Sequence, residues 1–276
     1  MAVYRHMDIG TAKPSPAEQA ELRYHLLDLA DPEEEFTVAE FQAAARRVLA
    51  GIETRRHRAL LVGGTGLYLR AVVDDLDLPG RFPDVAAELE RQAADPGGVT
   101  ALHGRLGQLD PLAAARMIPT NRRRVVRALE VTLGSGRPFS SFGPGLGEYR
   151  PSAFEMVGIP FDPAATDSAI ARRFEDLMER GLLEEVRSLA HRPGGLSRTA
   201  RQALGYRELL GHLEQGVPLD QAVDEAVRRT RLFARRQWAW FRRDPRIWWL
   251  DQRRDLLSQL LERWDQAERL APAVGD

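Results

Sequence analysis

A short apolar segment that ends in a glycine-rich turn constrains the fold of this chain more than any other feature. Residues 58–62 read Arg-Ala-Leu-Leu-Val, and Gly63-Gly64-Thr65-Gly66 follows directly. An apolar run of this length that is closed by a tight turn is typical of a buried parallel strand. Residues 67–73 then continue as an expected helix. The order of strand, turn and helix predicts an α/β protein with a parallel sheet.

Helical periodicity marks three further segments. Residues 37–52 have apolar side chains at helical spacing, and Thr37 with Glu40 three positions later is typical of a capping box. Residues 167–189 are amphipathic, and residues 220–242 have the pattern of one long helix. We therefore expect three helices here.

The middle of the chain differs in character from its two ends. Residues 81–150 contain helical stretches and loops rich in glycine and proline, such as Pro96-Gly97-Gly98 and Gly143-Pro144-Gly145, whereas residues 155–161 return to a strand pattern. We predict an α/β core formed by residues 1–80 and 151–276. Residues 81–150 are predicted to form a helical insertion domain.

The composition excludes several classes of protein. The chain has no cysteine, which excludes disulfides, thiolate catalysis and sulfur-ligated zinc. No apolar run approaches the ~18 residues that span a bilayer, and the N-terminus has no basic-then-apolar signal pattern. We expect a cytoplasmic protein that does not contact a membrane.

Arginine is concentrated near the C-terminal end. Residues 228–246 hold eight arginines and one acid, Asp244, although the net charge of the whole chain is −1. A local basic surface of this kind predicts a polyanionic partner. The alternative is compositional bias, because Lys13 is the only lysine among the 39 basic residues.

The arginines of residues 220–242 flank the helix surface that points away from an apolar stripe. That stripe consists of Val223, Val227, Ala234, Trp238 and Phe241. Arginine side chains suit phosphate oxygens, which they bind singly or in bidentate pairs. Trp238, Trp248 and Trp249 are expected in the core, whereas Trp240 lies outside the stripe and either packs or stacks on a base.

Two other segments have side chains suited to an anionic ligand. The glycines of residues 63–66 allow close approach, the N–H groups of the following helix attract anions, and Thr65 adds a hydroxyl. An ordinary strand–helix turn is the alternative. Residues 121–130 place three arginines before a helix and one inside it, with Arg123 and Arg127 on one face. A solvated helix face is the alternative there.

Six blocks follow one another in an order that resembles the tRNA dimethylallyltransferase family. They are VYRHMDIGTAKP (3–14); HLLD (25–28) with DP (31–32) and FTVAEF (36–41); LVGGTGLY (61–68); RRVVRALE (123–130); QALGYRE (202–208); and TR (230–231) with RRQWAWFR (235–242). Each block alone is weakly specific, but six blocks in order are highly specific. The resemblance covers residues 3–250.

The resemblance implies a fold and a reaction. The implied fold is a P-loop NTPase-like parallel-sheet core with a helical insertion. The implied reaction transfers a dimethylallyl group from dimethylallyl diphosphate to the exocyclic amine of the adenosine next to the anticodon in tRNA. Such chemistry requires the base to be flipped out of its stack. The implied cofactor is Mg²⁺, the implied partners are tRNA and the diphosphate, and a monomer is expected.

The resemblance also implies roles for individual residues. Thr65 would be catalytic, in the channel near the reacting groups, and Arg231 would bind the substrate diphosphate. The residues implied in tRNA binding are Arg123, Arg124, Arg127, Gln202, Gly205, Tyr206, Arg207, Arg235, Arg236, Gln237 and Arg242. Ala86 stands where the family often has an arginine that approaches tRNA.

The expected phosphate loop is not among these 276 residues. The family begins with a strand and a loop of the G-x-x-x-x-G-K-[ST] type, whose hydroxyl holds Mg²⁺. A second strand then ends in the aspartate that deprotonates the amine. Because the first strand and the P-loop are absent, no metal ligand is assigned and the chain as given is expected to be inactive or nearly so. We expect that the start codon was assigned too late; a true truncation is the alternative.

Two other functions compete with this interpretation. A non-catalytic tRNA-binding protein would use the same basic surfaces without transfer. An adenine-nucleotide prenyltransferase shares the expected core, but the long arginine helix favours a macromolecular substrate, because a mononucleotide needs no such groove.

Overall fold

The chain folds into two compact units. The computed structural model describes residues 1–143 and 145–270, with side chains as far as residue 266; Pro144 of the predicted Gly143-Pro144-Gly145 loop lies outside the described residues. Unit 1 comprises Met1–Val72 and Ser152–Asp276, and unit 2 comprises Val73–Pro151. The structure thus places the first boundary after Val72, whereas the sequence predicts it after residue 80.

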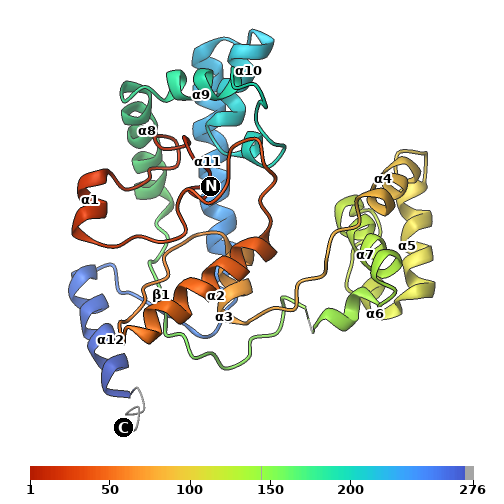
Figure 1. Cartoon of the computed structure of the whole chain (residues 1–276), viewed down its shortest axis with the longest axis horizontal. Helices are drawn as coiled ribbons and strands as arrows, with labels where there is room; N and C mark the ends of the chain where they lie inside the picture. The colour runs from red at the N-terminus through yellow and green to blue at the C-terminus, as the bar shows by residue number, and fades with distance from the viewer. Residues whose placement is uncertain (144, 271–276) are drawn as a thin grey trace. The chain divides into compact units, whose positions relative to one another are not determined.

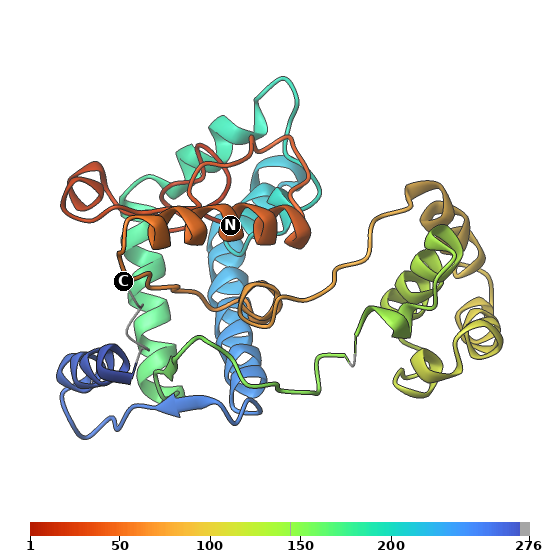
Figure 2. The ribbon, with the colours of Figure 1, turned by 60° about the horizontal axis from the view of Figure 1, so that its bottom comes forward.

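Unit 1 is mainly helical. Its helices and strands are α1 (Pro16–Glu21), α2 (Val38–Thr54), α3 (Gly66–Val73), β1 (Met156–Gly158), α8 (Pro163–Glu179), α9 (Leu182–Ala190), η2 (Ala200–Gln202), α10 (Tyr206–Gln215), α11 (Leu219–Phe241), β2 (Ile247–Trp249) and α12 (Leu256–Leu270). Helices α8 and α11 run side by side, and β1 and β2 lie beyond one end of this pair (Figures 1 and 2).

The sheet in the described residues is a parallel pair. β1 pairs with β2 so that Met156 faces Ile247 and Gly158 faces Trp249. This parallel pair and the surrounding helices confirm the predicted α/β class with a helical insertion. The predicted strand over residues 155–161 is confirmed, although only three of its residues are in β1.

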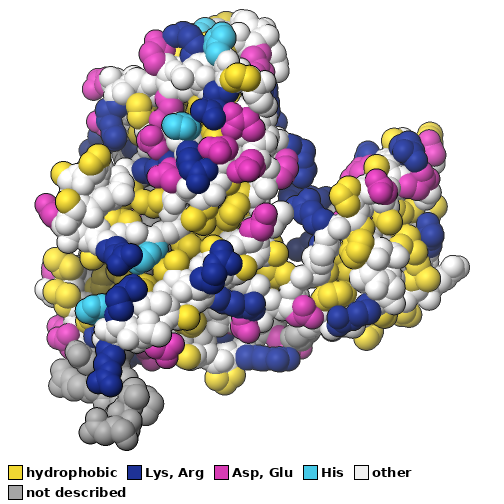
Figure 3. All heavy atoms as spheres, viewed as in Figure 1, with side chains coloured by type: hydrophobic (Ala, Val, Ile, Leu, Met, Phe, Trp, Pro, Cys, Tyr) yellow, Lys and Arg dark blue, Asp and Glu magenta, His cyan; other side chains and the backbone are white. Residues whose placement is uncertain are grey.

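The prediction of a buried strand at residues 58–62 is wrong. These residues form neither a helix nor a strand, and Leu60 and Val62 are 62% and 81% exposed. A strand needs a neighbour to satisfy its backbone N–H and C=O groups, and no strand of the described part of the chain lies beside this segment. The face that holds α2 also shows hydrophobic side chains at its surface (Figure 3).

Two of the three predicted helices are confirmed and one is interrupted. Helix α2 begins after Thr37, whose side chain and that of Glu40 form the predicted capping box. Helix α11 is the predicted long helix. The segment 167–189 is divided between α8 and α9, because Gly181 adopts a φ of 94° that ends the helical path.

The burial of α11 differs from the predicted stripe. Its buried residues are Ala222 and Ala226, whereas Val223, Val227, Ala234, Trp238 and Phe241 are half-buried. Trp238 packs edge-on against Trp249 at 4.8 Å between ring centroids. Trp248 was expected in the core but is 38% exposed. The two alanines are the most buried residues of α11, because small side chains allow α10 and α8 to pack closely against this helix.

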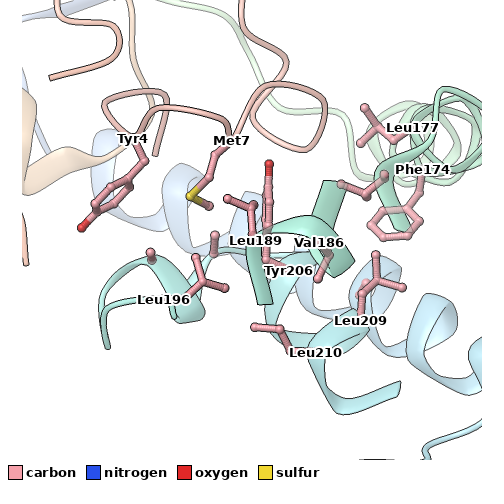
Figure 4. Packing of buried hydrophobic residues seen from close by; sticks show 14 of the residues in the cluster. Tyr4, Met7, Phe174, Leu177, Val186, Leu189, Leu196, Tyr206, Leu209 and Leu210 are labelled. Carbon is pink, nitrogen blue, oxygen red and sulfur yellow. The ribbon is translucent and has the colours of Figure 1, made fainter. Parts of the chain in front are cut away.

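The core of unit 1 joins the N-terminal loop to helices α8–α11. Its buried residues include Tyr4 and Met7 from the loop, Leu189 from α9 and Tyr206 from α10, and Figure 4 shows them within one cluster. Glu185 of α9 fastens this loop. Its carboxylate accepts hydrogen bonds from the backbone N–H groups of residues 8 and 9 at 2.8 Å each and of residue 10 at 3.2 Å, and from the Tyr206 hydroxyl at 2.5 Å.

Lys13 closes the same loop on itself. Its side chain is 4% exposed. Its ammonium group donates to the Tyr4 carbonyl and to the carboxylates of Asp8 and Asp28, each at 2.6 Å. A buried ammonium group is tolerated because all three of its hydrogens have acceptors.

Unit 2 is a small helical domain. It consists of α4 (Pro83–Gln92), α5 (Gly98–Leu109), α6 (Pro111–Ala115), α7 (Arg122–Ser135) and η1 (Phe139–Phe142). Leu89, Leu106, Val125 and Leu129 are among its fully buried side chains. Asn121 caps α7 by accepting a hydrogen bond from the N–H of Arg124. Ala86 lies in α4 of this unit.

None of the helices in the described residues is both long and apolar enough to cross a membrane.

We predict that Tyr206→Phe lowers the free energy of unfolding by about 1–2 kcal/mol, because it removes a hydrogen bond to a carboxylate but leaves that carboxylate bonded to three N–H groups. Urea unfolding monitored by circular dichroism measures the change. Tyr24→Phe is the control, since Tyr24 is 42% exposed. Equal effects of the two substitutions would contradict the role of the Tyr206 hydroxyl.

Candidate functional site

The loop formed by residues 63–66 lies against the C-terminal half of α11. Gln237 donates from its side-chain amide to the Gly64 carbonyl at 2.9 Å. A methyl group added at Gly64 would overlap the Gln237 amide nitrogen, and one added at Gly66 would overlap the Trp240 indole. Gly64 and Gly66 do not have positive φ values. The close approach of α11 therefore leaves no room for a side chain at either position unless Gln237 or Trp240 moves.

Thr65 lies between these two covered glycines. It is exposed, and its carbonyl accepts the N–H groups of Tyr68 and Leu69 at 3.0 and 3.1 Å in the first turn of α3. Thr65 is therefore at the surface, while the backbone beside it is bound by α3 on one side and by α11 on the other. Trp240, whose role the sequence leaves open, packs on Gly66 and is half-buried.

Several arginines of α11 are bound to carboxylates of the protein. Arg228 and Arg229 donate to Glu225 at 2.6 and 2.5 Å, and Arg229 also lies 3.4 Å from Glu208 of α10. Hydrogen bonds from Arg228 and then Arg229 lower the pKa of Glu225 to about 2. Because Glu225 stays charged at neutral pH, it competes with any phosphate for these two side chains.

Arg235 and Arg231 both lie against Asp167 of α8. Arg235 forms a bidentate pair with the Asp167 carboxylate at 2.7 and 3.0 Å, and Arg231 donates to the Asp167 carbonyl at 3.3 Å. Arg231 also lines a cavity of about 340 Å³ between α8 and α11, together with Glu175 and Asp224. Those two carboxylates disfavour an anion inside the cavity.

Three arginines at the C-terminal end of α11 have no acidic partner. Arg236, Arg242 and Arg243 are exposed, and within the described residues none of them forms an ion pair. The nearby acid, Asp244, is bound instead to Arg246 at 2.7 Å. Burial alone would raise the pKa of Asp244, but the hydrogen bonds from Arg246 outweigh it and the pKa is lowered. The end of α11 is therefore the uncompensated part of the basic helix.

The predicted arginines of α7 differ in their surroundings within unit 2. Arg123 and Arg124 are exposed. Arg127 is half-buried and binds Glu130 at 2.7 Å and the carbonyls of Pro79 and Gly80 at 2.9 and 3.0 Å. Arg127 thus fixes the segment that leads into α4, while Arg123 and Arg124 keep their charges at the surface.

The predicted residues of the 202–208 block also separate into surface and core. Gln202 and Arg207 are exposed and lie 3.4 Å apart. Gly205 and Tyr206 are buried, and burial followed by the hydrogen bond to Glu185 raises the pKa of Tyr206. Tyr206 therefore has its ring in the core and its hydroxyl bound to protein, which is not the geometry of a side chain that contacts tRNA.

The partners of these arginines were not identified in the sequence analysis. The pairs of Glu225 with Arg228 and Arg229 follow from three- and four-residue spacing on one helix, a signal that the sequence contains. The pair of Asp167 with Arg235 joins two helices that are distant in the sequence. No local pattern indicates such a contact.

Comparisons with known proteins give a consistent result. Residues 2–244 match the family model described as IPP transferase. The tRNA dimethylallyltransferase of Kineococcus radiotolerans is 46% identical over 250 residues, which cover 91% of this chain and 78% of that protein. The tRNA dimethylallyltransferase of Pseudarthrobacter chlorophenolicus is 43% identical over 260 residues, which cover 94% and 85%.

A solved structure is also similar. It is the full-length tRNA isopentenylpyrophosphate transferase from Bacillus halodurans, which is 35% identical with a TM-score of 0.67. The alignment covers 97% of this chain and 84% of that chain.

We predict that Arg235→Gln raises the pKa of Asp167, because hydrogen bonds from Arg235 hold that pKa below its ordinary value of 3.8. The stabilisation from this pair is present above pH 3.8 and is lost as the pH falls through the lowered pKa of the folded protein. Carbon-13 NMR titration of the aspartate carboxyls measures the pKa of Asp167 in the unsubstituted protein and in the variant. Arg172→Gln, an exposed position on α8, is the control and should leave the Asp167 titration unchanged.

Proposed function

This chain belongs to the IPP transferase family, a family of transferases, and we propose that the protein transfers a dimethylallyl group to tRNA. The donor is dimethylallyl diphosphate, and the acceptor is the exocyclic amine of the adenosine next to the anticodon. The amine nitrogen forms a bond to the first carbon of the dimethylallyl group, the bond from that carbon to oxygen breaks, and the diphosphate leaves with the electron pair. The amine then loses a proton to a base.

One observation supports this proposal most directly. The loop that carries Thr65 is hydrogen-bonded to the same helix that ends in exposed, uncompensated arginines. A helix that binds the phosphate backbone and also contacts the loop of a candidate catalytic residue would suit a reaction on a base. Such a base must first be flipped out of its stack. We propose that Thr65 lies near the reacting groups, where its hydroxyl is available to substrate.

We propose that exposed residues on three elements contact tRNA. They are Arg123 and Arg124 on α7, Gln202 and Arg207 beside α10, and Arg236 and Arg242 on α11. Arg127, Arg235 and Arg231 also donate to acceptors within the protein, which leaves each of them fewer N–H groups for tRNA or diphosphate.

The sequence contains no G-x-x-x-x-G-K-[ST] loop. In the described part of the chain, no group of three acidic or histidine side chains is placed to hold a metal ion. The described residues therefore do not fit an Mg²⁺ site. We propose that the protein acts as a monomer in the cytoplasm.

A second candidate function is tRNA binding without transfer. The exposed arginines of α7 and α11 would then bind the tRNA backbone, and no dimethylallyl group would be transferred. Prenylation of free adenine nucleotides is less well supported, because a mononucleotide does not need the long arginine-rich helix α11.

We predict that the 276-residue polypeptide binds an unmodified substrate tRNA but transfers no dimethylallyl group, because no G-x-x-x-x-G-K-[ST] loop occurs in its sequence. The assay measures transfer from dimethylallyl diphosphate with and without Mg²⁺. The comparison polypeptide is extended upstream to the nearest in-frame start. Transfer by the extended form alone supports the proposed function, whereas transfer by both would show that the loop and base are dispensable. Binding without transfer by either would favour the tRNA-binding protein.

We predict that Arg242→Gln lowers the slope of log Kd against log salt concentration for tRNA by about 0.7–0.9, the value for one lost phosphate contact. Arg228→Gln removes the same charge but should leave the slope unchanged, because Arg228 is bound to Glu225. Fluorescence anisotropy between 50 and 200 mM salt, roughly the range over which such contacts weaken, measures both slopes. Equal slopes for the two variants would contradict the assignment of the free end of α11 to tRNA.

A further inference from the structure

The resemblance implies that Gln237 binds tRNA, but the contacts of its side chain indicate another role. We propose that Gln237 is a positioning residue that holds the Thr65 loop against α11, and that it is not a tRNA contact. This inference rests on the proposed function in assigning Thr65 to the reacting groups. It differs from that function in assigning Gln237 a mechanical role within the protein.

The contact is specific in its geometry. The side-chain amide of Gln237 donates to the Gly64 carbonyl at 2.9 Å, one residue before Thr65. The amide nitrogen also occupies the space that a methyl group at Gly64 would need. Gln237 is half-buried, whereas its neighbour Arg236 is exposed and has no ion pair in the described residues. A half-buried amide that is bound to backbone is poorly placed to reach a phosphate.

A second residue on the same helical face completes the contact. Trp240 follows Gln237 by three positions, so both side chains lie on one side of α11. Trp240 covers Gly66 as Gln237 covers Gly64. Thr65, between the two glycines, is the exposed residue of this three-residue stretch, because its neighbours are half-buried under α11. The pair therefore fixes the backbone on both sides of Thr65 and leaves Thr65 itself at the surface.

The contact therefore connects two parts of the candidate site, the exposed arginines of α11 and Thr65. The helix that carries the free arginines Arg236 and Arg242 also sets the position of Thr65. A displacement of about 1 Å in a group that orients reacting atoms can cost about 100-fold in rate. Loss of the Gln237 hydrogen bond should therefore reduce the rate of the chemical step and leave the affinity for tRNA unchanged.

The test compares Gln237→Met with Arg236→Gln. Methionine keeps the length and the lack of charge of glutamine but cannot donate to the Gly64 carbonyl. In Gln237→Met we expect hydrogen exchange at the Tyr68 and Leu69 amides, which donate to Thr65, to become about fivefold faster, as for the loss of one hydrogen bond. The Kd for tRNA should stay within about twofold. Arg236→Gln should weaken tRNA binding and leave this exchange unchanged.

Kinetics and a double substitution separate positioning from general destabilisation. In whichever polypeptide transfers, Gln237→Met should lower kcat about tenfold and leave the KM for tRNA unchanged. Gly64→Ala displaces the same amide nitrogen, so it should have the same effects. The double variant should be little worse than either single variant, because both remove one shared contact. Additive effects would contradict the proposal.

Each result decides the question. A rise in Kd for Gln237→Met with unchanged exchange would assign Gln237 to tRNA and overturn the proposal. Unchanged exchange, affinity and kcat would overturn it as well, as would faster exchange with unchanged kcat. If no polypeptide transfers, the proposed function fails, and the exchange and affinity measurements still decide whether Gln237 holds the loop or binds tRNA.

Discussion

Much of unit 1 depends on the hydrogen bonds that the Glu185 carboxylate accepts. It accepts hydrogen bonds from three consecutive backbone N–H groups of the N-terminal loop and from the buried hydroxyl of Tyr206. One side chain thereby joins a loop without regular structure to helices α9 and α10. The loop brings Tyr4 and Met7 into the core that packs against α8 and α11. A half-buried carboxylate is stable there because four donors compensate for its lost hydration.

The position of α11 follows from that core. Its N-terminal half is buried through Ala222 and Ala226, and Arg229 extends to Glu208 of α10. Its middle is tied to α8 by the pair of Arg235 with Asp167. Beyond these contacts, Arg236, Arg242 and Arg243 are exposed and have no carboxylate partner in the described residues. The positive charge of the helix is thus compensated near the core and uncompensated at the C-terminal end.

Exposed apolar residues accompany the segment before the 63–66 loop. Leu60 and Val62 belong to a segment with the composition of a buried strand. The described residues provide no strand beside it. Backbone hydrogen bonding makes a strand a property of at least two segments, so apolar composition alone is insufficient. The same limitation explains why residues 155–161 yield only the short strand β1, whose extent is set by its pairing with β2.

The sequence by itself determined the features that depend on neighbours within a few positions. These are the capping box of Thr37 and Glu40, the length of α11, the helical character of unit 2 and the six blocks that identify the family. Tertiary structure alone decided that Tyr206 is buried, that Arg235 binds Asp167, and that Gly64 and Gly66 are covered by α11. Local patterns fix helix periodicity and caps, but partners distant in the sequence determine which side chains are neutralised, buried or free to bind.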